Sequence, residues 1–392
     1  MPPLRRPLEI FFWSRAAIWL TLLLAYVVFE ARYALPLHPP TTAPPPPTDV
    51  GWGFDLWARW DGGWYTHIAQ DGYTDPHSTT AFFPAYPMLV RALGWLIGGH
   101  YVLAGVIVSL IAAAVAFVLF HELARELVGD DAARRALVFL AVFPAALFLG
   151  AVYSESLYLL LSAAAFLAAV RGRFALAGVA AGLAILTRPT GVMLLPALAV
   201  LAWRAPSRAR AFAGVALAVP IGAIWPLWLW AAFGHPLEFL GAERNEWQRH
   251  LSPAGPLGGA WHGLVAGWRG IEQLIAGGNR FPGADDALQA AGLNLEALAA
   301  AVFAVVLGIV AWRRLGAAYG LFVLLSVALP LSTPTAIYPL LSMPRFVLGL
   351  FPVFIALGAI AKGPRSNAIL ITCFAILLGL DLARWVEWQF VA

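Results

Sequence analysis

Long apolar runs, many near or above the length that crosses a bilayer as a helix, recur along most of this chain. In lipid, only helices and closed barrels satisfy every backbone hydrogen bond within the protein. The runs are continuous and rich in Ala, Leu and Val, so we predict helices. The predicted spans lie near 16–34, 101–120, 136–152, 154–170, 174–187, 191–203, 212–232, 296–312, 317–332, 346–361 and 367–385. We therefore expect an all-α polytopic membrane protein with about 11 transmembrane helices, although two of the short segments around 150 and 188 could cross only part of the bilayer.

The composition excludes a soluble globular protein. Hydrophobic residues make up 61% of the 392 residues, charged residues only 12%, and the mean hydropathy is +0.77. Soluble domains carry about 25% charged and 45–50% apolar residues, and a soluble chain of this length could not bury so much apolar surface. We expect residues 1–392 to form one transmembrane domain.

The basic residues indicate membrane topology and not a nucleic-acid surface. The net charge is +4, and the basic residues cluster at the ends of the apolar runs. Arg5, Arg6 and Arg15 precede the first run, which is too long for a cleaved signal peptide and lacks a small-residue cleavage site. We therefore expect a retained signal anchor. The single cysteine, Cys373, lies in an apolar run and cannot form an intrachain disulfide.

Basic clusters between the spans predict which loops share a side of the membrane. With a cytoplasmic N-terminus, the positive-inside rule is met at every turn on that side. The clusters are Arg134 with Arg135, Arg171 with Arg173, Arg204 with Arg208 and Arg210, Arg313 with Arg314, and Lys362 with Arg365. Two long loops, 35–100 and 233–295, then face away from the cytoplasm. We expect a multi-pass protein of the inner (plasma) membrane that works on its extracytoplasmic side.

The first long loop holds the strongest candidate for chemistry. A Pro-rich stretch at 39–47, which we expect to be an extended linker, leads into an aromatic segment around Asp61. The side chains that a helix over 55–70 would place on the face of Asp61 are Trp57, Trp64, Tyr65 and Ile68. A carboxylate on such a stripe is costly unless it has a partner or a task, and partial desolvation would make it a better base. A solvated loop Asp beside interfacial tryptophans fits the composition equally well.

Three further charged residues interrupt the apolar runs on the same outer side. Glu155 fits a helix N-terminal charge, favoured by the helix dipole, better than a catalytic group. Arg188 and Arg345 lie beside apolar spans without acidic neighbours in sequence, which makes each a candidate to bind a phosphate or a carboxylate. Snorkelling to the interface is the alternative. We predict that the two guanidiniums approach each other and bind a substrate phosphate.

The sequence contains neither a metal signature nor a nucleotide-binding motif. Its eight histidines are scattered, without a His-x-x-Glu-His or a Cys/His cluster. A Gly-rich phosphate loop and a dinucleotide fingerprint are also missing. We therefore expect no metal and no other cofactor, and a phosphate-bearing substrate would arrive as a membrane lipid.

An ordered set of motifs follows the chain from the first loop to the last third. The set comprises Trp60-Asp61, Tyr65, Ala69, Gly72-Tyr73, Phe82-Phe83-Pro84-Ala85-Tyr86-Pro87, Pro144, Tyr153-Ser154-Glu155-Ser156, Thr187-Arg188-Pro189-Thr190-Gly191, and a weaker Pro344-Arg345-Phe346 with Phe351-Pro352. This set resembles the PIG-V-type mannosyltransferases, the family of the enzyme that adds the second mannose of glycosylphosphatidylinositol anchors. The resemblance covers about 55–205 well, and the Ala, Arg and Gly bias suggests a bacterial homologue.

The resemblance implies the GT-C class of membrane glycosyltransferases, which typically take a sugar from a polyprenyl-phosphate carrier on the non-cytoplasmic face. A carboxylate in the first outer loop serves as base there, and the resemblance places that role on Asp61. Arg188 and Arg345 would stabilise the charge on the leaving phosphate, and one displacement would invert the anomeric centre. Further side chains expected to contact substrate are Trp60, Trp64, Tyr65, His67, Gln70, Tyr86, Tyr153 and Glu155.

The leading hypothesis is therefore a mannosyltransferase that uses polyprenyl-phosphate mannose as donor, a lipid or glycan as acceptor, and membrane lipids as surroundings. A variant uses another polyprenyl-linked sugar, such as glucose or arabinose. A lipid or solute transporter would need ionisable residues in the middle of its spans, which the predicted spans nearly lack. A non-catalytic subunit of a larger complex stays open.

Overall fold

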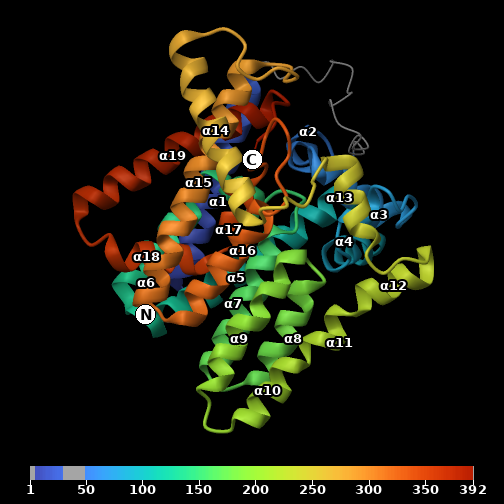
Figure 1. The fold of residues 1–392 in the computed structure, drawn as a ribbon, viewed down its shortest axis with the longest axis vertical. Coiled ribbons are helices and arrows are strands. Elements are labelled where there is room, and N and C mark those ends of the chain that lie inside the picture. The colour runs from blue at the N-terminus through green and yellow to red at the C-terminus, as the bar shows by residue number, and fades with distance from the viewer. Residues whose placement is uncertain (1–4, 30–48, 392) are drawn as a thin grey trace.

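The computed structural model describes residues 5–29 and 49–391. The Pro-rich stretch at 39–47, expected to be an extended linker, lies outside these ranges. Within them the chain forms helices, 3-10 segments and turns but no strand, which confirms the all-α class (Figure 1).

Among the described residues, five helical stretches are long and apolar enough to cross a bilayer. They are α1 (Arg5–Val28), α5 (Tyr101–Val128), the stretch Arg208–Phe233, α15 (Ala287–Arg314) and α19 (Pro364–Val386). Single residues that keep a helical conformation, Leu217 and Ala223, separate the third of these into α10 (Arg208–Ala216), α11 (Ala218–Gly222) and α12 (Ile224–Phe233). Shorter apolar helices are α7 (Glu155–Val170), α8 (Phe174–Ile185), α9 (Leu194–Trp203), α16 (Ala317–Leu331) and α18 (Phe351–Ile360). The predicted count of about 11 spans is not confirmed.

The span predicted over 136–152 is wrong as a continuous helix. Helix α6 (Asp130–Ala141) ends early, and the 3-10 segment η3 (Pro144–Leu149) follows. Proline lacks an N–H and fits only the first turn of a helix, so Pro144 starts a new segment. Arg15 lies buried inside α1 and donates to the carbonyls of Ala141 and Ala146 at 2.9 and 2.6 Å. Arg15 therefore satisfies backbone carbonyl groups where α6 ends and η3 begins. The sequence had instead indicated that Arg15 lies just before the first span, as a topology signal.

Small residues let the helices of the bundle approach closely. A Cβ on Gly178 of α8 would lie 2.0 Å from the carbonyl oxygen of Gly214 in α10, so only glycine fits there. The outer faces of the bundle expose large apolar side chains, including Leu20 and Leu24 of α1, Leu227 and Trp230 of α12, and Ile369 and Ile376 of α19. Exposed apolar faces of this extent are expected of helices that contact lipid.

Both long loops contain helices. The first forms α2 (Trp52–Asp55), η1 (Leu56–Ala58), α3 (Asp61–Asp71), η2 (Thr79–Ala81) and α4 (Ala85–Leu96). The second forms α13 (Glu238–Trp247) and α14 (Pro256–Ala276). Helix α3 packs on α4, and α13 packs on η2, so parts of both loops lie together at one side of the molecule (Figure 1). The two remaining short elements are η4 (Pro189–Met193) and α17 (Met343–Leu348).

Candidate active site

The backbone breaks immediately before Asp61. We considered from the sequence which side chains a helix over 55–70 would bring together, but η1 ends at Ala58 and α3 begins at Asp61. Between them Trp60 has a φ of 55°, in the left-handed region that a bulky side chain rarely adopts. A single helix over 55–70 therefore does not form, and Asp61 is the first residue of α3. A carboxylate at that position is favoured by the positive end of the helix dipole.

Contacts from the far end of the chain hold this break in place. The Arg59 guanidinium donates to the carbonyls of Trp385 and Val386, where α19 ends. The Trp60 ring packs edge-on against the ring of Phe390, with centroids 5.4 Å apart. Surroundings of this kind can maintain a strained residue, and strain of this kind is common at functional sites.

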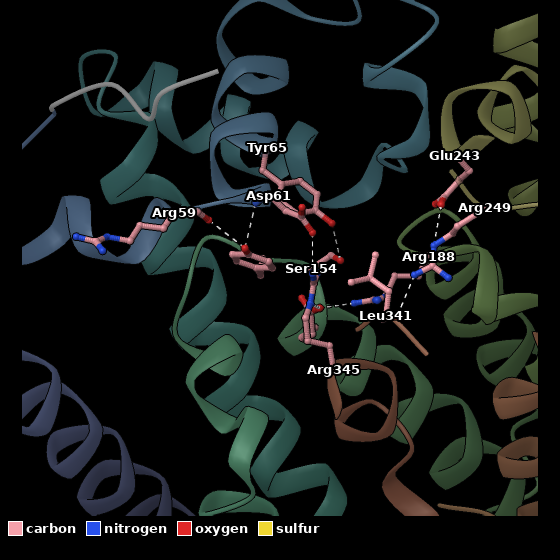
Figure 2. A network of polar contacts seen from close by, with 11 residues as sticks. Arg59, Asp61, Tyr65, Ser154, Arg188, Glu243, Arg249, Leu341 and Arg345 are labelled. Atoms are coloured by element: carbon pink, nitrogen blue, oxygen red, sulfur yellow. Dashed lines mark hydrogen bonds and ion pairs between the residues drawn. The ribbon is translucent and has the colours of Figure 1, made fainter. Parts of the chain in front are cut away.

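Asp61 is the partly exposed end of a chain of ion pairs (Figure 2). Its Oδ2 lies 2.7 Å from Nη1 of Arg345, and Nε of Arg345 lies 2.9 Å from Oε1 of Glu155. The same Glu155 oxygen lies 2.6 Å from Nη1 of Arg188. Side-chain exposure is 1% for Glu155, 8% for Arg345 and 12% for Arg188, but 23% for Asp61. The two arginines thus approach each other by sharing one carboxylate, and each has an acidic partner that its sequence neighbourhood did not reveal.

Four separate segments supply this cluster, and each residue lies at or near a helix end. Glu155 is the first residue of α7, as Asp61 is of α3. Arg188 caps η4, whose first turn begins at a proline, and Arg345 follows a proline in the first turn of α17. The helix breaks that the prolines and short segments create therefore place charged side chains where the bundle would otherwise be apolar.

Buried tyrosines surround the arginine and the base candidate. The Tyr153 hydroxyl donates to the carbonyl of Arg59 at 3.0 Å and accepts the N–H of Asp61 at 3.1 Å. Its ring lies 4.6 Å from the guanidinium carbon of Arg345, a cation–π contact. The Tyr65 hydroxyl donates to Oγ of Ser154 at 2.9 Å. These contacts fix the orientation of both Asp61 and Arg345.

The protonation states in this part of the site follow from burial and charge. Burial raises the pKa of Tyr65 and of Tyr153 well above the ordinary value, so both hydroxyls are neutral hydrogen-bonding groups. Burial alone would lower the pKa of Arg345, but the charges of Glu155 and Asp61 raise it well above its usual range. Arg345 is therefore a permanent cation.

A third arginine, which the sequence did not single out, faces the same site from the second loop (Figure 2). Arg249 donates to the carbonyl of Leu341 at 3.0 Å, and its Nε lies 3.4 Å from Oε2 of Glu243 in α13. The guanidinium carbons of Arg188 and Arg249 lie 5.4 and 5.7 Å from the Phe346 ring centroid. Burial raises the pKa of Glu243 and lowers that of Arg249, so this pair is less firmly ionised than the pairs around Glu155.

Some residues predicted to contact substrate lie apart from the ion-pair cluster. His67 pairs with Asp71 at 3.0 Å on the surface of α3, and Gln70 is exposed on the same helix. Tyr86 is fully buried, and its hydroxyl contacts Oγ of Ser109 at 2.8 Å. Trp64 stacks on Phe82, and Trp60 packs edge-on against Phe390.

A small cavity opens beside the two buried arginines. Its lining consists of Glu155, Tyr158, Arg188, Thr190, Ser326, Arg345, Phe346, Gly349 and Leu350. The charges of Arg188 and Arg345 are offset by those of Glu155 and Asp61, so the cluster around the cavity is close to neutral. In the part of the chain that the structure describes, no group of three or more His, Cys, Asp or Glu side chains could hold a metal ion.

The bundle shares its fold with solved membrane glycosyltransferase structures. ArnT from Cupriavidus metallidurans bound to undecaprenyl phosphate matches with a TM-score of 0.50 at 15% identity, over 82% of this chain and 59% of that chain. The archaeal oligosaccharyltransferase AglB from Archaeoglobus fulgidus, in complex with an inhibitory peptide and a dolichol-phosphate, gives a TM-score of 0.46 at 15% identity, over 96% of this chain and 56% of that chain. This chain therefore spans less than two thirds of either protein. The fold is similar to that of ArnT, which is one of the GT-C glycosyltransferases.

A protein-family model also matches part of the sequence. The model of the mannosyltransferase (PIG-V) family matches residues 8–201, just under half of the chain. This match confirms the resemblance to the PIG-V mannosyltransferases that the motifs indicated. No curated protein matches the sequence.

Proposed function

We propose that this protein is a GT-C glycosyltransferase that moves a sugar, mannose first among the candidates, from a polyprenyl-phosphate carrier to a hydroxyl of a lipid or glycan. The observation that carries the proposal is Asp61, a partly exposed carboxylate bonded to a buried arginine that is itself paired within the cluster. A hydroxyl is a poor nucleophile and needs a positioned base, and a phosphate is a good leaving group when cations surround it. The family match supports the sugar transfer, and mannose is suggested by the family name.

The proposed reaction is a single displacement at the anomeric carbon. Arg345 engages Oδ2 of Asp61, which leaves Oδ1 to accept the proton of the acceptor hydroxyl. The acceptor oxygen forms a bond to the anomeric carbon as the bond from that carbon to the phosphate oxygen breaks. The electron pair of the broken bond stays on the phosphate, next to Arg188 and Arg345. The products are an inverted glycoside and polyprenyl phosphate.

Arg345 would couple donor binding to activation of the base. When the donor phosphate binds Arg345, its anionic oxygens compete with Asp61 for the same guanidinium. Donor binding would then free the second oxygen of Asp61, so that the whole carboxylate faces the acceptor hydroxyl only when a donor is present.

The position of the cluster supports an extracytoplasmic active site. Glu155 begins α7 and Arg171 follows its last residue, so about 24 Å of helix separate them. Arg171 pairs at that far end with Glu122 and Glu126 of α5. The acid–arginine cluster and the basic end of α7 therefore lie on opposite sides of the bundle, as the positive-inside rule requires of an outward-facing site.

A transfer assay with a panel of donors tests the proposal. Purified protein is incubated with membrane lipid extract and labelled polyprenyl-phosphate mannose, glucose or arabinose. We expect label to pass from the mannose donor into a lipid or glycan product. Transfer from a different donor alone would correct the sugar, and no transfer from any of them would refute the proposal.

Lysine substitutions test the phosphate site separately. Arg188→Lys and Arg345→Lys keep the charge but lose the planar fork that binds phosphate and carboxylate oxygens in pairs. Each should weaken binding of polyprenyl phosphate. Unchanged affinity in both variants would contradict the assignment of these arginines to the donor phosphate.

A further inference from the structure

Three buried polar atoms around the cavity beside Arg188 and Arg345 lack a good partner. The Ser326 hydroxyl and Oε2 of Glu155 make no hydrogen bond to any residue in the described ranges, and the Tyr158 hydroxyl has the Thr190 hydroxyl as its side-chain partner, in a looser geometry. All three side chains line the cavity and are at most 2% exposed. Buried polar groups are almost always paired, so three of them around one cavity point to a ligand.

The mixture of groups indicates the kind of ligand. Oε2 of Glu155 is the oxygen that neither arginine engages, and a carboxylate oxygen can only accept a hydrogen bond. It needs a donor, whereas the hydroxyls of Tyr158 and Ser326 can donate or accept. The phosphate of a glycosyl phosphodiester offers acceptors alone, and it would be repelled by the carboxylate. The hydroxyls of a sugar both donate and accept, so a sugar satisfies all three atoms.

Gly349 and Phe346 also line the cavity. Gly349 has no side chain to cover the Tyr158 ring, because a Cβ at this position would lie 2.9 Å from the ring. Phe346 supplies an aromatic ring to the lining. Arg345 belongs both to this lining and to the ion pair with Asp61, so one guanidinium separates the cavity from the candidate base.

We propose that this cavity is the donor-sugar subsite, in which Glu155, Tyr158 and Ser326 bind hydroxyls of the sugar that the polyprenyl phosphate carries. The inference rests on the proposed function and adds to it the residues that recognise the sugar, as distinct from the phosphate and the lipid. Arg188 and Arg345 lie at the border of this subsite and face the phosphate. Tyr158 and Ser326 are then binding residues that no sequence motif identified.

Affinities for two lipids separate sugar recognition from phosphate recognition. Binding of polyprenyl phosphate and of polyprenyl-phosphate mannose is measured for the wild type, Tyr158→Phe and Ser326→Ala. Each substitution removes one hydroxyl and little else. Ser162→Ala is the matched control, because Ser162 is a buried serine of the same helix as Tyr158 whose hydroxyl donates to the Leu159 carbonyl at 3.1 Å.

We expect Tyr158→Phe and Ser326→Ala each to weaken binding of the mannosyl lipid about 3- to 10-fold, the effect of one net hydrogen bond, and to leave binding of polyprenyl phosphate unchanged. The control should change neither affinity. Equal weakening for both lipids would mean that the cavity holds the phosphate, and unchanged binding of both would mean that it holds no part of the donor; either result overturns the inference. A wild-type protein that binds neither lipid would contradict the proposed function itself.

Discussion

Glu155 is the residue whose removal should affect the site most, because two buried arginines share it. Glu155→Gln keeps the shape of the side chain but removes its charge, so Arg188 loses its only carboxylate partner among the described residues, while Arg345 keeps Asp61. Breaking a buried ion pair costs about 3–5 kcal/mol. The glutamine oxygen still accepts one hydrogen bond, so we expect the lower end, about 3 kcal/mol, or about 100-fold in the folding equilibrium.

Glu126→Gln is a matched control, which shows how much stability is lost when a glutamate in an exposed ion pair is neutralised. Glu126 pairs with Arg171 at the other end of the bundle, but the two side chains are 30% and 41% exposed. Exposed pairs contribute about 0–1 kcal/mol, so Glu126→Gln should barely change stability. Unfolding of both variants by denaturant in detergent micelles measures the difference.

The functional part of this prediction concerns the ligand. With Glu155 neutralised, the two arginines carry an excess positive charge that an anionic lipid can offset. Polyprenyl phosphate should therefore stabilise Glu155→Gln more than it stabilises the wild type. At a lipid concentration 100 times the Kd of the variant, the variant gains about 2.7 kcal/mol. A loss of stability no larger than that of Glu126→Gln, or equal stabilisation of variant and wild type by the lipid, would refute the role given to Glu155.

Two further predictions test the second loop and the bundle. Burial raises the pKa of Glu243, so this group gains a proton more readily as the pH falls and then releases Arg249. The affinity for polyprenyl-phosphate mannose, whose own charge stays constant, should therefore rise as the pH falls, and Glu243→Gln should show the high affinity throughout. A pH dependence that persists in Glu243→Gln would contradict a link between Glu243 and donor binding. Gly178→Ala should destabilise the protein by about 1–3 kcal/mol in denaturant unfolding, because the added Cβ would lie 2.0 Å from the Gly214 carbonyl oxygen. Gly379→Ala is the control and should be neutral or stabilising, because nothing lies within 4 Å of its Cβ. Equal effects of the two substitutions would show that the contact between α8 and α10 adapts to the larger side chain.

Local chemistry in the sequence was enough to predict the class of fold and several members of the site. The apolar runs required helices, and the charged residues that interrupt them were costly in lipid without a partner. Asp61, Glu155, Arg188 and Arg345 were therefore identifiable one by one, and the structure brings all four into one chain of ion pairs. Their pairing did not follow from the sequence, because the partners come from segments far apart in the chain.

The features that the sequence did not reveal depend on distant contacts. The break before Asp61 is held by Arg59, which bonds carbonyls at the end of α19. Arg249 belongs to the site only because α13 folds back over the first loop, and the one available signal was its place near Trp247 in an aromatic loop on the predicted outer side. The polar atoms of Tyr158 and Ser326 looked like ordinary members of apolar helices.

Turnover of Asp61→Asn tests the central claim most directly. Asparagine keeps the size of the side chain but cannot take up the acceptor proton, so transfer from a labelled polyprenyl-phosphate sugar should fall by about 10²–10⁴-fold. Binding of the donor should be kept or strengthened, because Arg345 loses a competing carboxylate while Glu155 still holds it. A folded Asp61→Asn protein that binds donor but transfers sugar at the wild-type rate would contradict the assignment of Asp61 as the base.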